Sequence, residues 1–104
     1  MKQIHDVVIF CAVHSTNEED AARIQAFMKS IDPELGFSPC RESESLNDCL
    51  EFRGAGPCTP AQKEELLARC DDDWDEDDGT WWAYGFNTTM FDDQVYYLQF
   101  DFSF

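Results

Sequence analysis

The first apolar segment of the chain is continuous rather than alternating. Residues 7–13 read Val-Val-Ile-Phe-Cys-Ala-Val, seven apolar residues in a row with many β-branched side chains. A short run of this kind is typical of a strand that is buried on both faces. We therefore predict that residues 7–13 form a central strand of a sheet.

A helical periodicity follows this strand. Thr16 and Glu19 have the spacing of a capping box, and Asp32-Pro33 disfavours helical backbone beyond residue 31. The apolar residues between these signals recur at i, i+3, i+4 and i+7, which predicts one buried face of a helix over residues 17–31. These residues are Ala21, Ile24, Phe27, Met28 and Ile31.

The middle of the chain, residues 33–58, is interrupted by glycine and proline and carries weaker signals. Residues 36–38 are predicted as a short strand. Residues 48–53 place Leu50 and Phe52 on one side and polar side chains on the other, which predicts a half-exposed strand.

A second helix begins at Thr59-Pro60-Ala61-Gln62, where threonine is the cap, proline takes the first turn and glutamine completes a capping box. Leu66, Leu67 and Cys70 supply its apolar side. The helix is predicted to end at Cys70 or Asp71, because acidic side chains at a helix C-terminus oppose its dipole by about 0.3–1 kcal/mol each. The acidic residues that follow are therefore predicted to be a loop or an extended segment.

Two alternating runs close the chain. Residues 79–87 and 94–104 both alternate with period two and are rich in aromatic side chains, which predicts an antiparallel hairpin. Together these elements predict a single domain over residues 1–104 with an α+β fold: a mainly antiparallel sheet with two helices on one face. A ferredoxin-like arrangement is one way to connect them.

Charge is the strongest functional signal in the sequence. Twenty-two acidic and 7 basic residues give a net charge of −15, against a magnitude of about 2–8 that suits solubility in a small domain. Self-repulsion of this size destabilises a compact chain, which favours a role in binding a cationic partner. Solubility, a halophilic host and a solvated acidic face are the alternatives.

Direct binding to nucleic acid or to an anionic membrane is disfavoured, because both depend on clustered cations. The seven basic residues are scattered instead, and each has acidic neighbours. They are Lys2, Arg23, Lys29, Arg41, Arg53, Lys63 and Arg69.

No signal peptide and no membrane-spanning run is recognisable, so we predict a cytoplasmic protein whose five cysteines are reduced. The thiols could ligate zinc, but the gaps between Cys40, Cys49, Cys58 and Cys70 are eight, eight and eleven residues, unlike the short knuckles of structural zinc sites. Buried thiols that pack as small apolar groups are favoured.

The sequence indicates neither a catalytic pair nor a calcium-binding loop. Cys11 and His14 would point to opposite faces of a strand, which disfavours a nucleophile–base pair. The acidic run fails as an EF-hand, because Gly79 comes one position late and Tyr84 stands where the twelfth-position glutamate belongs. We predict no catalytic residue, no metal and no cofactor.

The acidic run matches the charge spacing of nucleic acid. Seven of the eight residues from Asp71 to Asp78 are acidic. An extended chain advances about 3.3–3.6 Å per residue, close to the 3.4 Å of helix axis per charge on one DNA strand. The exception, Trp74, could serve as an anchor for a partner's arginine. The alternative is a solvated acidic loop with Trp74 folded into the core.

The predicted partner-binding residues extend this run by two further acidic groups, at the start of the first helix and before the last strand. The full set is Asp71, Asp72, Asp73, Trp74, Asp75, Glu76, Asp77, Asp78, Glu18, Glu19, Asp20, Asp92 and Asp93.

In its size, charge and aromatic content the chain resembles small acidic phage or mobile-element proteins that occupy the nucleic-acid channel of a defence complex, such as anti-CRISPR and anti-restriction inhibitors. The resemblance implies a non-enzymatic inhibitor that acts in the cytoplasm of a bacterial host cell. An immunity protein that neutralises a basic nuclease toxin is the alternative, and a metal protein that uses the cysteines is a third possibility.

Overall fold

A central strand with a neighbour on each side organises the sheet. The structure is a computed structural model that describes residues 5–104. Strand β1 (Asp6–Val13) pairs antiparallel with β4 (Leu50–Pro57) on one side and with β7 (Val95–Phe102) on the other. The predicted central position of this strand is confirmed.

The shorter strands extend the sheet outwards from these three. On the β4 side lie β2 (Gly36–Phe37) and β3 (Arg41–Glu42), and on the β7 side lie β6 (Thr80–Tyr84) and then β5 (Asp75–Asp77). The strand order within the described residues is β2-β4-β1-β7-β6-β5, with β3 also paired to β4, and every pairing is antiparallel.

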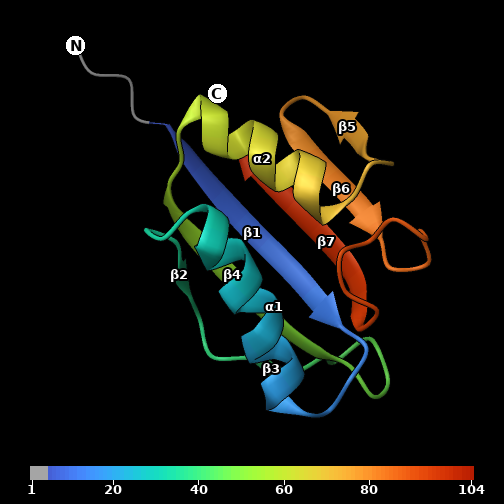
Figure 1. Ribbon diagram of the computed structural model, residues 1–104. Coiled ribbons are helices and arrows are strands. Elements are labelled where there is room, and N and C mark those ends of the chain that lie inside the picture. Colours follow the sequence, from blue (N-terminus) through green and yellow to red (C-terminus); the bar gives the residue numbers. More distant parts are fainter. Residues whose placement is uncertain (1–4) are drawn as a thin grey trace.

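Both helices cover the same face of the sheet (Figure 1). Helix α1 (Glu18–Ile31) follows β1, and helix α2 (Pro60–Cys70) follows β4. The predicted α+β class is therefore confirmed. The order β1-α1-β2-β4-α2-β7 is compatible with the β-α-β-β-α-β order of a ferredoxin-like arrangement, with β3 inserted between β2 and β4 and with β5 and β6 inserted before the last strand.

One face of β1 is fully buried and the other is open except at Ala12, so the prediction that the strand is buried on both faces was wrong. Val7, Ile9 and Cys11 point to the helices and are fully buried, whereas Val8 on the opposite face is 46% exposed and Phe10 is partly exposed. An apolar run does not show whether one layer or two will cover a strand. Here the two helices share one side, and the other side of the sheet remains open.

The N-terminal caps of the two helices lie within one residue of the positions predicted from the sequence. Asn17, not Thr16, caps α1, and its side chain accepts a hydrogen bond from the Glu19 backbone N–H at 2.9 Å. Thr59 and Gln62 form the predicted reciprocal capping box at the start of α2. Asn17 lies one position nearer to the helix than Thr16, and its side chain accepts from a backbone N–H of the first turn, as the predicted threonine cap would have done.

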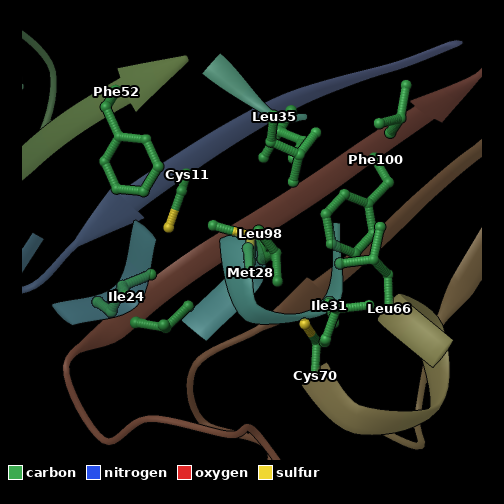
Figure 2. Close-up of a cluster of buried hydrophobic side chains, with 14 of the residues drawn as sticks. Cys11, Ile24, Met28, Ile31, Leu35, Phe52, Leu66, Cys70, Leu98 and Phe100 are labelled. Atoms are coloured by element: carbon green, nitrogen blue, oxygen red, sulfur yellow. The ribbon is translucent and has the colours of Figure 1, made fainter. Parts of the chain in front are cut away.

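The core forms between the helices and the covered face of the sheet (Figure 2). Ile24 and Met28 of α1 and Leu66 of α2 meet Leu98 and Phe100 of β7, and all five side chains are fully buried. The predicted apolar faces of both helices thus pack onto the inward-facing positions of the predicted aromatic strand. No helix of residues 5–104 is long and apolar enough to cross a membrane.

The predicted hairpin is confirmed, and it carries an additional edge strand. Asp77 pairs with Thr80, and Asp78 and Gly79 between them both have positive φ, 51° and 86°. This is the pattern of a type I′ two-residue turn, for which Asp-Gly is a preferred pair. The acidic run is extended as predicted, but its residues 75–77 form strand β5 rather than a loop.

The end of α1 buries a carboxylate. Asp32 is the C-cap of the helix and has no solvent exposure, and its side chain accepts a hydrogen bond from the Glu34 N–H at 3.3 Å. Burial raises the pKa of Asp32 above its usual value, and the nearby negative charge of Glu34 acts in the same direction. The folded protein therefore binds a proton at Asp32 more readily than the unfolded chain does.

We expect Asp32→Asn to stabilise the protein at neutral pH by about 1–3 kcal/mol, the order of the cost of burying a poorly compensated polar group. Because the folded pKa lies above the unfolded one, the contribution of Asp32 to stability is full at acid pH and is lost as pH rises through the folded pKa. The gain in the variant should therefore appear at pH 7 and vanish near pH 3. Urea unfolding of both proteins at the two pH values measures it, and a variant less stable than the parent at pH 7 would contradict the expectation.

Candidate acidic interface

Most of the acidic run lies on an edge of the sheet. Strand β5 pairs with β6 and forms the end of the sheet path (Figure 1). The carboxylates of the run are solvent-exposed, apart from that of Asp71. We call the exposed set the acidic edge, and it consists of Asp72, Asp73, Asp75, Glu76, Asp77 and Asp78.

The strand geometry divides these carboxylates between two faces. Asp75 and Asp77 are the register partners of Trp82 and Thr80 and share one face, while Glu76 between them points to the other. Carboxylates on one face are therefore about 6.6–6.8 Å apart, twice the rise of a strand per residue. Each face matches every second charge of a DNA strand along its axis, rather than every charge as the sequence alone predicted.

Asp71 does not belong to the exposed set. It is 1% exposed, and its carboxylate accepts hydrogen bonds from the Asn87 side-chain amide at 2.6 Å and from the Thr89 hydroxyl. These contacts join the end of α2 to the loop after β6. The predicted role of Asp71 as a partner contact is corrected to a structural one, because its oxygens are already occupied.

Trp74 also faces inwards. Its ring packs against the core, with its centroid 5.4 Å from that of Phe100. Its indole N–H donates to the carbonyl oxygens of Leu67 at 2.8 Å and Asp71 at 3.1 Å, groups at the C-terminus of α2 that lack helical partners. The alternative in which Trp74 folds into the core is therefore the one that the structure supports, and Trp74 holds the base of the acidic edge in place.

The second predicted group, Glu18, Glu19 and Asp20, begins α1 and is separate from the acidic edge. Helix α1 contacts β4, on the other side of the central strand from β5. Hydrogen bonds from Ser15 and Arg23 lower the pKa of Asp20. The structure therefore does not place this group and the acidic edge on one continuous surface.

In the third predicted group, Asp92 and Asp93, one carboxylate is paired with an arginine and the other is not. Arg23 donates to both oxygens of Asp92, with distances of 2.8 and 2.9 Å, and this pairing lowers the pKa of Asp92. Asp93 is exposed and, among the described residues, makes no ion pair. Asp93 is therefore the member of this group that is free to meet an external cation.

The acidic edge has no internal counter-charge among residues 5–104. The ion pairs of the described chain join Arg23 to Asp20 and Asp92, Arg41 to Glu51, and Arg69 to Glu65. All of these lie outside residues 72–78. The six carboxylates of the acidic edge therefore project an uncompensated negative field into solvent.

The pKa of each of the five thiols is raised, chiefly by burial, and this disfavours the thiolate that acts as a nucleophile. Burial raises the pKa of Cys58 to about 11 and that of Cys70 to about 12, and it raises the pKa of Cys11 still further. Cys11 and Cys70 lie inside the core (Figure 2), whereas His14 is exposed. Within the part of the chain that the structure describes, no cluster of three or more potential ligands could hold a metal ion.

The open face of the sheet was not anticipated from the sequence. Phe10, Tyr97 and Tyr84 form a line of ring contacts across β1, β7 and β6, with centroids 6.2 and 5.5 Å apart. The guanidinium of Arg53 lies over Phe10 at 5.1 Å. The period-2 alternation of the sequence separates these residues from those on the other face. It does not show which of the two faces the helices cover.

Comparison of the chain with protein-family models, with curated proteins and with solved structures found no match.

The buried role of Asp71 can be tested against a neighbour of equal charge. We expect Asp71→Ala to reduce the free energy of unfolding by about 1–3 kcal/mol, because the Asn87 and Thr89 donors lose their acceptor. Asp72→Ala, which removes the same charge from an exposed position, should change stability by less than about 0.5 kcal/mol. Denaturant unfolding of the two variants makes the comparison, and equal effects would refute the structural role of Asp71.

Proposed function

We propose that this chain is a non-enzymatic inhibitor that binds the basic nucleic-acid groove of a partner protein by presenting the acidic edge in place of phosphate. The observation that carries the proposal is the set of six exposed carboxylates on the edge hairpin and the segment just before it, with no ion-pair partner among the described residues. The net charge of −15 reinforces it, because the whole chain adds to the attraction for a basic groove.

The hairpin makes the acidic edge different from a disordered acidic tail. The Asp78-Gly79 turn and the pairing of β5 with β6 fix the backbone, and Trp74 fixes the approach from α2. A surface that is already ordered loses less conformational entropy on binding. The carboxylates can therefore be presented to a groove in a fixed geometry.

A competing explanation is that the charges protect the sheet. An edge strand exposes unpaired backbone groups, and charged side chains on it prevent pairing with a second chain. Protection requires only charge on β5 itself, Asp75 to Asp77. The acidic edge also includes Asp72 and Asp73, which precede the strand and line a shallow depression of about 500 Å³ with Asn87, Thr88 and Thr89. These additional charges favour a binding role.

The central test removes the charges in the acidic edge without changing the fold. A partner is first captured from host lysate at low and high salt and identified by mass. Replacing Asp72, Asp73, Asp75 and Asp77 by Asn should then weaken its binding by roughly tenfold or more, since each rim charge contributes about 0.2–1 kcal/mol. The dependence of affinity on salt concentration should also become shallower.

The control variant carries the same change in net charge at exposed positions outside the acidic edge. Replacing Glu34, Glu42, Glu44 and Glu64 by Gln gives −15 + 4 = −11, as the acidic-edge variant does. Equal weakening by the two variants would show that total charge, rather than the acidic edge, determines affinity.

Competition with duplex DNA or RNA tests mimicry directly. If the inhibitor occupies the nucleic-acid groove of the partner, the inhibitor and the nucleic acid should not bind the partner at the same time. A complex that contains both would disprove the mimicry. A captured partner that is a nuclease toxin neutralised by the chain would favour the immunity-protein alternative over a defence complex.

A further inference from the structure

A cavity of about 450 Å³ lies at the end of the sheet where β6 ends and β7 begins. The residues that line it include three aromatic ones, Tyr84, Phe86 and Tyr96, together with His14 and Asp93. The rings are unusually open to solvent for large apolar side chains: Phe86 is 76% exposed and Tyr96 is 45% exposed.

Two backbone features shape this cavity. Gly85 lies directly against β7, so that a Cβ on it would come within 1.7 Å of the Val95 carbonyl oxygen, and its N–H donates to the Tyr96 carbonyl at 2.8 Å. Only glycine permits this close approach. It brings the segment that carries Tyr84 and Phe86 against the start of β7.

The second feature is a bulge in β7. Ala12 pairs with Tyr97 and Val13 pairs with Val95, which leaves Tyr96 as the additional residue. A bulge redirects the side chain at this position. The Tyr96 ring consequently lies beside His14, with an edge-on geometry and centroids 6.3 Å apart, on the wall of the cavity.

Two of the aromatic rings lie parallel, so that each leaves its outer face for a further planar group. The rings of Tyr84 and Phe86 are stacked with centroids 5.2 Å apart and an angle of 7° between their planes. The faces of aromatic rings carry partial negative charge and attract cations, and a planar guanidinium can also stack on them.

The charge at the cavity has the sign that would attract such a group. No lysine or arginine is among the residues that line it, and Asp93 makes no ion pair among the described residues. Its neighbour Asp92 is already held by Arg23. The cavity thus combines open aromatic faces with one uncompensated carboxylate, inside a chain of net charge −15.

We propose that this cavity binds an arginine side chain of the basic partner, with the guanidinium stacked on the Tyr84–Phe86 pair and hydrogen-bonded to Asp93. The assignment rests on the proposed function in one respect, the basic character of the partner. It adds a second contact to the acidic edge, one that selects arginine over lysine through stacking and paired hydrogen bonds.

The test titrates the ¹⁵N-labelled protein with three capped pentapeptides at low salt, Gly-Gly-Xaa-Gly-Gly with arginine, lysine or citrulline as Xaa. The arginine peptide should shift the amide resonances of Gly85, Phe86 and Tyr96. The lysine peptide should bind more weakly because it cannot stack as a plane. The uncharged citrulline peptide should produce the smallest shifts.

Two exposed-site variants test the contacts without disturbing the core. Phe86→Ala and Asp93→Asn should each weaken arginine-peptide binding about two- to fivefold, the effect of one exposed cation–π or charge contact. Val8→Ala is the matched control, because it removes an exposed apolar side chain that does not line the cavity and should leave the binding unchanged.

The acidic-edge variant separates this assignment from the proposed function. With Asp72, Asp73, Asp75 and Asp77 replaced by Asn, the shifts at Gly85, Phe86 and Tyr96 should persist. Shifts confined to residues 72–78 of the parent protein, or equal responses to arginine and lysine, would overturn the arginine site. These titrations use peptides and not the partner protein. That result would therefore not decide the groove-binding proposal, which is tested by the partner-binding experiment above.

Discussion

The pairing of β1 with strands on both sides is the constraint on which the rest of the structure depends. Because β4 and β7 take all of its backbone partners, β1 must lie in the middle, and its alternating side chains must define a covered face and an open one. The helices that follow β1 and β4 then bury Val7, Ile9 and Cys11 beneath a single layer. The other strands extend the sheet outwards from these three.

This arrangement explains how a chain of net charge −15 can remain compact. The apolar side chains meet between one helical layer and one sheet face, so the acidic side chains can nearly all be placed at the periphery, where water screens them. The one acidic residue of the run that is buried, Asp71, has hydrogen-bond donors on both oxygens. The most concentrated charge lies on β5, the strand furthest from β1 on its side of the sheet.

The acidic edge and the aromatic cavity both belong to the half of the sheet that extends from β1 through β7 and β6 to β5. Trp74 and Asp71 connect this half of the sheet to α2, which keeps the charged hairpin and the loop after β6 in a fixed relation to the core. Two residues that the sequence marks as candidates for binding, Trp74 and Asp71, therefore support this surface from below. Tyr96 and Phe86, which carry no such signal, are exposed on it together with the carboxylates of the acidic edge.

Local signals in the sequence determined much of the fold. The apolar spacing of Ile24 and Met28, the Thr59–Gln62 capping box and the alternation of residues 94–104 each depend on near neighbours in the chain, and each led to the correct element. The extended form of the acidic run was also predictable, because the helix dipole and the self-repulsion of the charges act within a few residues. The Asp-Gly pair at 78–79 is a hairpin signal of the same local kind, and it could have located β5.

Tertiary structure alone decided which surfaces are open. Whether one layer or two covers β1, whether Trp74 faces a partner or Phe100, and where the bulge directs Tyr96 all depend on pairings between residues far apart in the chain. A charge pattern shows the sign of the field that a chain can produce. Only the folded structure shows that Arg23 neutralises Asp92, that Asp71 is buried, and that six carboxylates of the run remain free at the edge of the sheet.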